Sequence, residues 1–274
     1  MYPYMLIATD LDGTLLDSRG RVSEENLRAL DTLAKKGVHL SVATGRTYSE
    51  IPKQVLDCEA FRYFIYANGS MTLDRMNGQR ISACIKNETA KKIMEIFADY
   101  EIHITARNNG NCYYDGRYPI HEWQKHFRID PAHVRCVGEF GQPVEDIFAL
   151  VSSLDEIEVF SIYFRYDDEQ KECEKRLNAL GNVYITSTSA TNFEIFDNDA
   201  GKDKALLRLA SYLGLSREQT MTLGDSENDL AMTKASGLGL VAANGSPALL
   251  SVADGVMCSN DEHVIRYVLE NYFS

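Results

Sequence analysis

Two aspartates, Asp10 and Asp12, follow a run of apolar residues in the stretch IATDLDGTLLD, residues 7–17. Carboxylates at the end of a buried strand repel one another unless a positive charge lies between them. The stretch is therefore either an acidic turn, for which Asp12 and Gly13 are ordinary residues, or one half of a metal and phosphate site. Two distant segments and one lysine bear on this choice.

Polar residues also follow two other predicted strands. ATGR, residues 43–46, and GDSEND, residues 224–229, each come after an apolar run, and Lys202 stands at the start of a predicted helix. In an open α/β sheet, ligands bind at the carboxyl ends of the strands, where segments far apart in sequence converge. Taken singly, SEND is equally a helix cap, and a TG pair or one lysine is commonplace. Their joint occurrence in this order favours one shared site.

The elements expected around these segments alternate between strand and helix patterns. A continuous apolar run is typical of a strand covered on both faces, and Ser23 and Gly37 are suitable residues to begin and end the first helix. The order β-α-β-α-β predicts a parallel, doubly wound sheet with right-handed crossovers. The expected elements are strands over 5–10, 38–45 and 63–69 and helices over 23–37 and 48–57.

From about Ile81 the pattern changes. A helix over 87–100, an extended run over 102–107 and a hairpin over 111–120, turning at Asp115-Gly116, indicate a mixed, antiparallel sheet. The first pattern returns near Asn192, with a helix over 200–214 and a strand over 220–225. We therefore predict an outer domain of residues 1–81 and 190–274 and an inserted domain of residues 82–189.

Composition excludes several classes of protein. The formal charge of −12 argues against nucleic acid and anionic membranes as partners. No apolar run approaches the ~20 residues that span a bilayer, and the first ten residues lack the basic region of a signal peptide. The six cysteines include no C-x-x-C pair, so a zinc knuckle or a disulfide framework is not expected. A reducing cytoplasm is the expected location.

The set DLDGTLL, ATGR, Lys202 in KDKAL and GDSENDLAM resembles the haloacid dehalogenase superfamily, specifically its Cof-like phosphatases. YANGS, with Asn68 and Gly69, is similar to the segment that leads into the caps of that subfamily. The resemblance implies an α/β fold with a Rossmann-like core and an inserted α/β cap domain. One departure is Asp203, where these proteins often have glycine, but an acid suits a helix N-terminus.

The resemblance implies a Mg²⁺-dependent phosphatase that forms an aspartyl-phosphate on Asp10, with Asp12 as general acid and base. The metal ligands would be the carboxylates of Asp10 and Asp225 and the backbone carbonyl of Asp12, supported by Asp229. Phosphate oxygens would be bound by Thr44, Gly45, Lys202 and Asn228. Arg46 would face the cap or the substrate, or form a surface salt bridge, and Asn68 is a further supporting residue. The cap would close over the site, with residues 106–123 as its substrate-facing surface or as an ordinary exposed hairpin.

The implied substrate is a small phosphorylated metabolite: a sugar phosphate, a phosphorylated cofactor such as pyridoxal phosphate or flavin mononucleotide, or a nucleotide. The first alternative is a phosphotransferase or phosphomutase of the same superfamily, which passes the phosphoryl group to another hydroxyl. The second is a signalling receiver with a phosphorylated aspartate. Receivers lack a large insertion and an acid two residues after the phosphorylated one, so this alternative fits the sequence less well.

Overall fold

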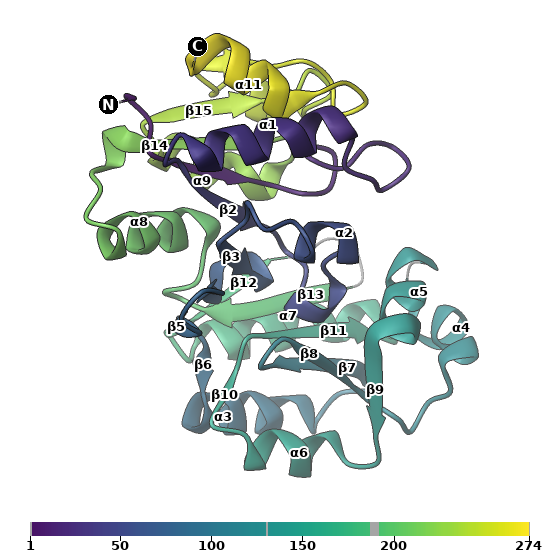
Figure 1. The fold of residues 1–274 in the computed structure, drawn as a ribbon. Helices are drawn as coiled ribbons and strands as arrows, with labels where there is room; N and C mark the ends of the chain where they lie inside the picture. Colours follow the sequence, from purple (N-terminus) through teal and green to yellow (C-terminus); the bar gives the residue numbers. More distant parts are fainter. Residues whose placement is uncertain (1, 130, 187–191, 274) are drawn as a thin grey trace. The chain divides into compact units, whose positions relative to one another are not determined.

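A computed structural model describes residues 2–129, 131–186 and 192–273 of the chain (Figure 1). The chain forms two compact units. Unit 1 comprises residues 1–46, 51–82 and 201–274, and unit 2 comprises residues 47–50 and 83–200. The α/β fold expected from the sequence is confirmed, with unit 1 built from both ends of the chain.

Unit 1 contains an eight-stranded sheet with the strand order β16-β15-β14-β1-β2-β3-β4-β5. The strands from β16 to β3 are parallel, as predicted, and β4 and β5 are antiparallel. Its strands are β1 (Leu6–Thr9), β2 (His39–Ala43), β3 (Tyr63–Tyr66), β4 (Met71–Asp74), β5 (Gln79–Ser82), β14 (Thr220–Gly224), β15 (Leu238–Val241) and β16 (Gly255–Val256).

The helices of unit 1 lie between these strands in sequence. They are α1 (Glu24–Lys35), α2 (Lys53–Leu56), α8 (Lys202–Tyr212), α9 (Leu230–Ala235), α10 (Pro247–Leu250) and α11 (Val264–Tyr272), with short 3₁₀ turns η2 (Ala67–Gly69), η4 (Arg217–Gln219) and η5 (Glu227–Asp229). The prediction for α1 is confirmed, because the Ser23 hydroxyl accepts from the Asn26 amide and Gly37 follows the helix with a positive φ of 83°. Leu30 and Leu33 of this helix are fully buried.

The hairpin of β4 and β5 was not predicted from the sequence. Gly78 has a φ of 71°, and its amide donates to the Asp74 carbonyl, which closes the turn. The Asp74 carboxylate also accepts two hydrogen bonds from the Arg62 guanidinium. This polar turn interrupts the apolar pattern by which a strand is normally recognised.

Unit 2 contains a six-stranded sheet with the order β12-β13-β11-β7-β8-β9 and a two-stranded sheet of β6 and β10. Its strands are β6 (Ile85–Lys86), β7 (Ile102–Asn108), β8 (Asn111–Asp115), β9 (Gly141–Val144), β10 (Glu156–Ile157), β11 (Val159–Phe164), β12 (Val183–Thr186) and β13 (Asn192–Asp197). Its helices are α3 (Asn87–Phe97), α4 (Trp123–Phe127), α5 (Pro131–Phe140), α6 (Ile147–Ser153) and α7 (Asp167–Asn178), with 3₁₀ turns η1 (Tyr48–Glu50) and η3 (Ile120–Glu122).

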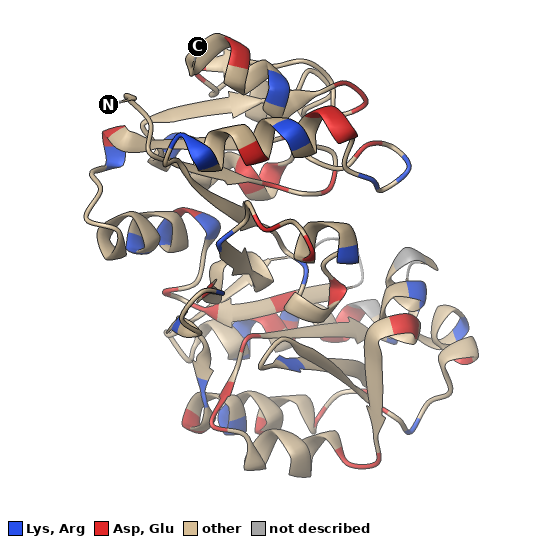
Figure 2. Ribbon diagram, in the orientation of Figure 1, with Lys and Arg blue, Asp and Glu red and all other residues tan. Residues whose placement is uncertain are grey.

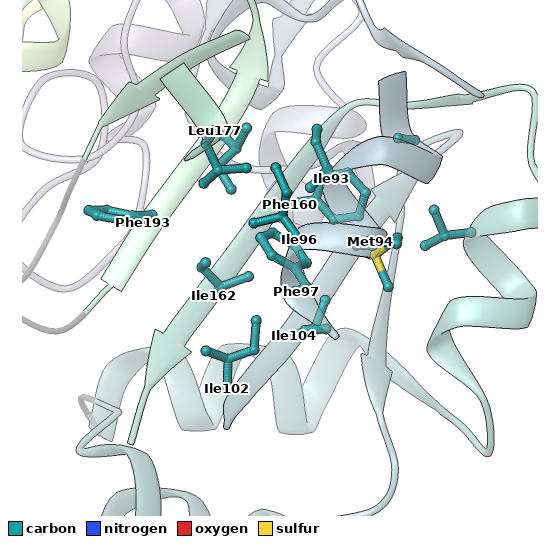
Figure 3. Close-up of a cluster of buried hydrophobic side chains, with 14 of the residues drawn as sticks. Ile93, Met94, Ile96, Phe97, Ile102, Ile104, Phe160, Ile162, Leu177 and Phe193 are labelled. Atoms are coloured by element: carbon teal, nitrogen blue, oxygen red, sulfur yellow. The ribbon is translucent and has the colours of Figure 1, made fainter. Parts of the chain in front are cut away.

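One face of the six-stranded sheet packs against α3, α6 and α7 through a buried hydrophobic cluster (Figure 3). Ile104 and Ile162 are partners in the register of β7 and β11 and lie on this face. The rings of Phe97 and Phe160 meet edge to face at 5.8 Å between centroids. Because side chains alternate along a strand, Thr105 and Ser161 lie on the opposite face.

Two features of unit 2 differ from the sequence prediction. The hairpin turns at Asn109-Gly110 rather than at Asp115-Gly116, since Asn108 pairs with Asn111 across the turn. Both turn residues have positive φ, 53° and 76°, which is the two-residue geometry that an Asn-Gly pair favours. The second boundary between the domains also differs from the prediction. Strand β13 pairs with β11 and β12 of unit 2, so the chain returns to unit 1 at Gly201 rather than at residue 190.

Residues 47–50 were expected in the outer domain but pack in unit 2. The Ser49 amide donates to the Gly110 carbonyl at 3.1 Å, and the Glu50 carboxylate pairs with Arg107 at 3.4 Å. Residues 106–123, expected at a surface, include a fully buried Trp123 that packs with Tyr114 and Phe127 in a second cluster. Much of this stretch is therefore core rather than exposed hairpin.

Charged residues are distributed over both units (Figure 2). Both signs occur along α1, where Glu24 pairs with Arg28 and Asp31 with Lys35 one helical turn apart. Within the residues that the structure describes, no helix combines the length and the apolar character needed to cross a bilayer.

Candidate active site

Three neighbouring parallel strands bring the predicted site segments together. Strand β1 lies between β14 and β2, with Thr9 paired to Leu223 on one side and to Val42 on the other. Asp10, Thr44 and Asp225 each follow the last residues of one of these strands. Because the strands are parallel and in register, their carboxyl ends lie at the same edge of the sheet.

The ammonium group of Lys202 lies between two carboxylates. Its Nζ donates to Asp10 Oδ1 and to Asp229 Oδ1, at 2.7 Å in each case. All three side chains are buried. Lys202 is the first residue of α8 and follows Gly201. The start of this helix therefore places a cation at the edge of the sheet where Asp10 lies.

Asp229 is held by the turn that contains it. Its Oδ2 accepts from the amides of Asp225 and Ser226, at 3.0 and 3.3 Å, and the Ser226 hydroxyl caps the same turn in return. A Cβ at Gly224 would lie 2.7 Å from the Asp229 carboxylate, so the glycine makes room for it. Asp229 therefore acts as a cap, which was the alternative interpretation of the SEND segment, and it also contacts Lys202 in the site.

The charge balance of this site perturbs its titration. Burial is the largest cause that raises the pKa of Asp10 to about 8, while Lys202 lowers it and Asp229 raises it. Burial and the Asp229 carboxylate raise the pKa of Asp225 to about 6. Burial alone would lower the pKa of Lys202, but Asp10 and Asp229 outweigh it and raise that pKa above its ordinary value. At Asp10, burial therefore outweighs the effect of the ammonium charge.

The three carboxylates suit a metal ion. Oxygen atoms of Asp10, Asp225 and Asp229 lie within 4.8 Å of one another. Three negative charges against the single charge of Lys202 leave an excess of two, and carboxylate oxygens are the ligands preferred by hard divalent cations. The residues present therefore fit a divalent cation. The predicted role of the Asp12 carbonyl as a ligand stays a prediction.

The carboxylate of Asp12 is turned toward Arg46 instead. Arg46 Nε donates to Oδ2 and Nη2 to Oδ1, both at 2.8 Å. The Arg46 and Asp12 side chains remain 32% and 59% exposed, which distinguishes them from the buried Asp10. Of the two roles considered for Arg46, this structure has the salt bridge, and its partner is the predicted acid and base.

The loop after β1 is shaped around Asp225. Gly13 has a φ of 75°, and a Cβ there would lie 2.3 Å from Asp225 Oδ2. The hydroxyl of Thr14 donates to Asp225 Oδ1 at 3.3 Å. Any side chain at position 13 would displace this carboxylate, so glycine is required both for its conformation and for its size.

Sequence reasoning missed two asparagines that hold the same loop. Asn244 Nδ2 donates to the Gly13 carbonyl at 2.8 Å, and Asn260 Nδ2 donates to the Leu16 carbonyl at 2.9 Å. The Asn260 amide in turn donates to Asn244 Oδ1. Asn244 follows β15, a further parallel strand, so its place after a strand end was the available signal.

Three other predicted site residues, Thr44, Asn228 and Asn68, have hydrogen bonds or contacts of their own in the structure. Thr44 is buried, and its hydroxyl accepts from the Arg46 amide at 3.2 Å. Asn228 is exposed and its Oδ1 accepts from Ser226 Oγ at 2.6 Å, which leaves its NH₂ group as a donor. Asn68 lies against Gly45, where a Cβ would be 3.0 Å from Asn68 Oδ1. Phosphate binding by these residues stays a prediction.

Known proteins resemble the chain over nearly its whole length. The model of the haloacid dehalogenase-like hydrolase family matches residues 7–269. The phosphatase YwpJ of Bacillus subtilis is 29% identical over 97% of this chain and 99% of its own. A 5-amino-6-(5-phospho-D-ribitylamino)uracil phosphatase, YcsE of the same organism, is 26% identical over 97% and 95%. A haloacid dehalogenase-like hydrolase from Bacteroides thetaiotaomicron superimposes with a TM-score of 0.82 at 20% identity, over 98% and 100% of the two chains.

The fold and the family model indicate a hydrolase. The chain belongs to the haloacid dehalogenase-like hydrolase family, which confirms the resemblance seen in its motifs. The expectation of an enzyme that acts on phosphoric monoesters agrees with the named phosphatases among its relatives.

Proposed function

We propose that the protein is a Mg²⁺-dependent phosphatase that hydrolyses a small phosphorylated metabolite through an aspartyl-phosphate on Asp10. The observation that carries this proposal is the Lys202 ammonium at 2.7 Å from both Asp10 and Asp229, beside Asp225. A buried carboxylate at a strand end, with a fixed cation beside it, has the environment that a carboxylate nucleophile needs.

In the first step an Asp10 carboxylate oxygen attacks phosphorus. The new bond joins Asp10 to the phosphoryl group, and the bond from phosphorus to the alcohol oxygen breaks. Each pair of like charges about 4 Å apart costs roughly 4 kcal/mol at an effective dielectric near 20. Attack on a phosphate dianion therefore requires positive charge at the site, of which Lys202 supplies one unit.

Mg²⁺ would be held by Asp10 and Asp225, with the carbonyl of Asp12, and Asp229 would orient Lys202 and the Asp225 backbone. When bound, it would supply positive charge that offsets the excess of carboxylates and the charge of the phosphoryl group. Thr44, Gly45 and Asn228 would donate hydrogen bonds to the phosphoryl oxygens, where positioning and charge stabilisation account for most of the catalysis.

Asp12 would give a proton to the leaving alcohol. In the second step it would take a proton from a water whose oxygen bonds to phosphorus while the bond from phosphorus to Asp10 breaks, which releases phosphate and restores Asp10. Both oxygens of the Asp12 carboxylate accept hydrogen bonds from Arg46. To donate a proton, Asp12 has to leave at least one of these hydrogen bonds. Arg46 would thus act on the reaction by positioning Asp12.

The relatives support a proposal for the substrate class. A related phosphatase is named for a phosphorylated ribitylaminouracil, and we infer a substrate of similar kind, a sugar phosphate or phosphorylated cofactor. We infer a cytoplasmic location, which is supported by the fact that none of the six cysteines forms a disulfide.

The test is phosphate release from a panel of phosphomonoesters by the purified chain, with Mg²⁺ and with a chelator. Asp10→Asn is expected to keep the fold and to lower turnover by at least about a thousandfold, because the amide cannot attack phosphorus. Asp17→Asn is the matched control, since Asp17 lies in the same stretch but bonds to the amides of Arg19 and Arg21. Near-normal activity in Asp10→Asn would disprove the mechanism.

A further inference from the structure

Three consecutive residues adopt left-handed backbone conformations directly after β3. Ala67, Asn68 and Gly69 have φ values of 48°, 50° and 87°, and we call these residues the left-handed turn. Such conformations are routine for glycine and tolerable for asparagine but unfavourable for alanine. Strain of this kind persists where the surroundings enforce it, and it is concentrated at functional sites.

On one side, the left-handed turn holds the loop that follows β2. The Ala67 amide donates to the Arg46 carbonyl at 2.8 Å, and the Asn68 amide donates to the Thr44 carbonyl at 3.1 Å. Because a trans peptide unit is planar, the amide of Gly45 points opposite to the Thr44 carbonyl. The hydrogen bond from Asn68 to the Thr44 carbonyl therefore directs the Gly45 N–H away from the turn.

The side chain of Asn68 adds to this contact. A Cβ at Gly45 would lie only 3.0 Å from Asn68 Oδ1 and 3.3 Å from Nδ2, so the carboxamide packs directly on the glycine. Asn68 Oδ1 is buried and has no hydrogen-bond partner. A buried acceptor without a donor is unfavourable for stability, so its place against Gly45 is not explained by its own hydrogen bonding.

On the other side, the left-handed turn contacts Gly201 and Lys202 at the start of α8. A Cβ at Gly69 would lie 2.2 Å from the Gly201 carbonyl oxygen and 2.9 Å from the Lys202 amide nitrogen. The Gly69 carbonyl also accepts from Arg208 Nη2 of α8 at 3.2 Å. The backbone of the turn therefore lies directly against the start of α8.

We propose that the left-handed turn is a positioning element of the active site. By contacting the backbone of both, it sets the spacing between the Thr44–Gly45 loop and Lys202. Thr44 and Lys202 are 158 positions apart in the sequence. The inference rests on the proposed function, because it assigns the turn to the binding of the phosphoryl group by these residues.

The first test compares two glycines that both have positive φ. Gly69→Ala places a methyl group against Gly201 and Lys202, whereas Gly78→Ala, at a φ of 71° in the β4–β5 turn, meets no atom within 4 Å. Both variants carry the strain of a left-handed alanine, so the difference between them reports the contact. We expect Gly69→Ala to lower kcat/KM about tenfold or more and to weaken inhibition by inorganic phosphate, since small displacements of binding groups are costly. Gly78→Ala should remain within about twofold of the wild type.

The second test does not depend on a steric clash. Asn68→Gly keeps a residue suited to positive φ and removes the carboxamide that packs on Gly45, so folding is expected to be preserved. We expect inorganic phosphate to inhibit this variant about fivefold more weakly, with a melting temperature within about 3 °C of the wild type. A purely structural role would instead lower the melting temperature and leave phosphate inhibition unchanged. If Gly69→Ala does not fold, Asn68→Gly decides the question.

Lys202→Met separates this inference from the function on which it rests. An active Lys202→Met enzyme would overturn the proposed function. If Lys202→Met is inactive while folded Gly69→Ala and Asn68→Gly keep the kcat/KM and phosphate inhibition of the wild type within about twofold, far below the effect expected for misplaced groups, only the inference about the turn is overturned.

Discussion

Each of the two units buries a basic side chain, and the two environments differ in the balance of charge. In unit 1, Lys202 donates to two carboxylates at 2.7 Å, with a third carboxylate close by. In unit 2, Arg107 donates to Ser161 Oγ at 2.8 Å and pairs with Glu50 at 3.4 Å. Burial alone does not distinguish the two environments from each other, since both cations and their partners are nearly inaccessible to solvent.

The effect on the acid that pairs with each cation is opposite for Asp10 and Glu50. The pKa of Asp10 is raised to about 8, chiefly by burial. Burial also acts on Glu50, but Arg107 and the hydrogen bonds from Thr47 outweigh it and lower the pKa of this carboxyl. Asp10 and Asp225 of unit 1 thus have raised pKa values, whereas Glu50 is held in its charged form by Arg107. An excess of buried carboxylates, rather than a buried ion pair as such, indicates a site for a cation and a reaction.

The largest expected effect is on catalysis in unit 1. Lys202→Met should lower kcat/KM by about a thousandfold, because it removes a preorganised positive charge from the transferring phosphoryl group. Steady-state kinetics with the best substrate of the panel measure this. Arg107→Met is the comparison, and an equal loss of activity in both variants would contradict the distinction between the two cations.

The next effect is on the stability of unit 2. Arg107→Met leaves Glu50 buried without its counter-charge and should lower the free energy of unfolding of this unit by about 3 kcal/mol. Trp123, the single tryptophan of the chain, is buried in unit 2, so its fluorescence during denaturation reports on that unit. Adding Glu50→Gln should recover part of the loss. Failure of the double variant to recover any stability would show that lost packing, not the unpaired charge, causes the effect.

The smallest effect is the pH dependence of stabilisation by Mg²⁺. The folded-state pKa values of Asp10 and Asp225, about 8 and about 6, lie above the ordinary value of 3.8. Their contribution to stability in metal-free protein therefore declines as the pH rises from about 4 to about 8. Mg²⁺ binds the ionised carboxylates, so it should raise the melting temperature more at pH 8 than at pH 5.5, by a few degrees.

Asp225→Asn is the control for this measurement, since it removes one proposed ligand and should abolish most of the Mg²⁺ effect. The Glu50 pair has the opposite sign. Its lowered pKa means that it stabilises unit 2 above the ordinary pKa of glutamate and loses this contribution as the pH falls. A Mg²⁺ shift that is independent of pH, or unchanged in Asp225→Asn, would contradict the assignment of the cation to the acids of unit 1.

Much of unit 1 was predictable because its signals are local. A buried parallel strand is a continuous apolar run, and Asp10, Thr44 and Asp225 each follow one. The hairpin of β7 and β8 was predicted at the wrong place, although the Asn109-Gly110 pair that forms it is a strong turn signal. Asp115-Gly116 is a similar pair, and only the pairing of Asn108 with Asn111 distinguishes them.

The contacts between distant segments were not predictable from local signals. Asn244 and Asn260 hold the carbonyls of Gly13 and Leu16, and an asparagine in a polar loop carries no sign of which carbonyl it will meet. The same is true of residues 47–50, whose sequence does not indicate that Ser49 and Glu50 bond to the second unit.

By itself, the sequence determined the class of the sheet, the family and the residue types of the site, because strand pattern, turn chemistry and the spacing within each motif are properties of short segments. The tertiary structure alone decided that Lys202 lies between Asp10 and Asp229, that Asp12 pairs with Arg46, and that Ala67–Gly69 contacts both the Thr44–Gly45 loop and the start of α8. These are interactions across long sequence separations. They depend on how parallel strands place their ends side by side, and a one-dimensional pattern does not contain that geometry.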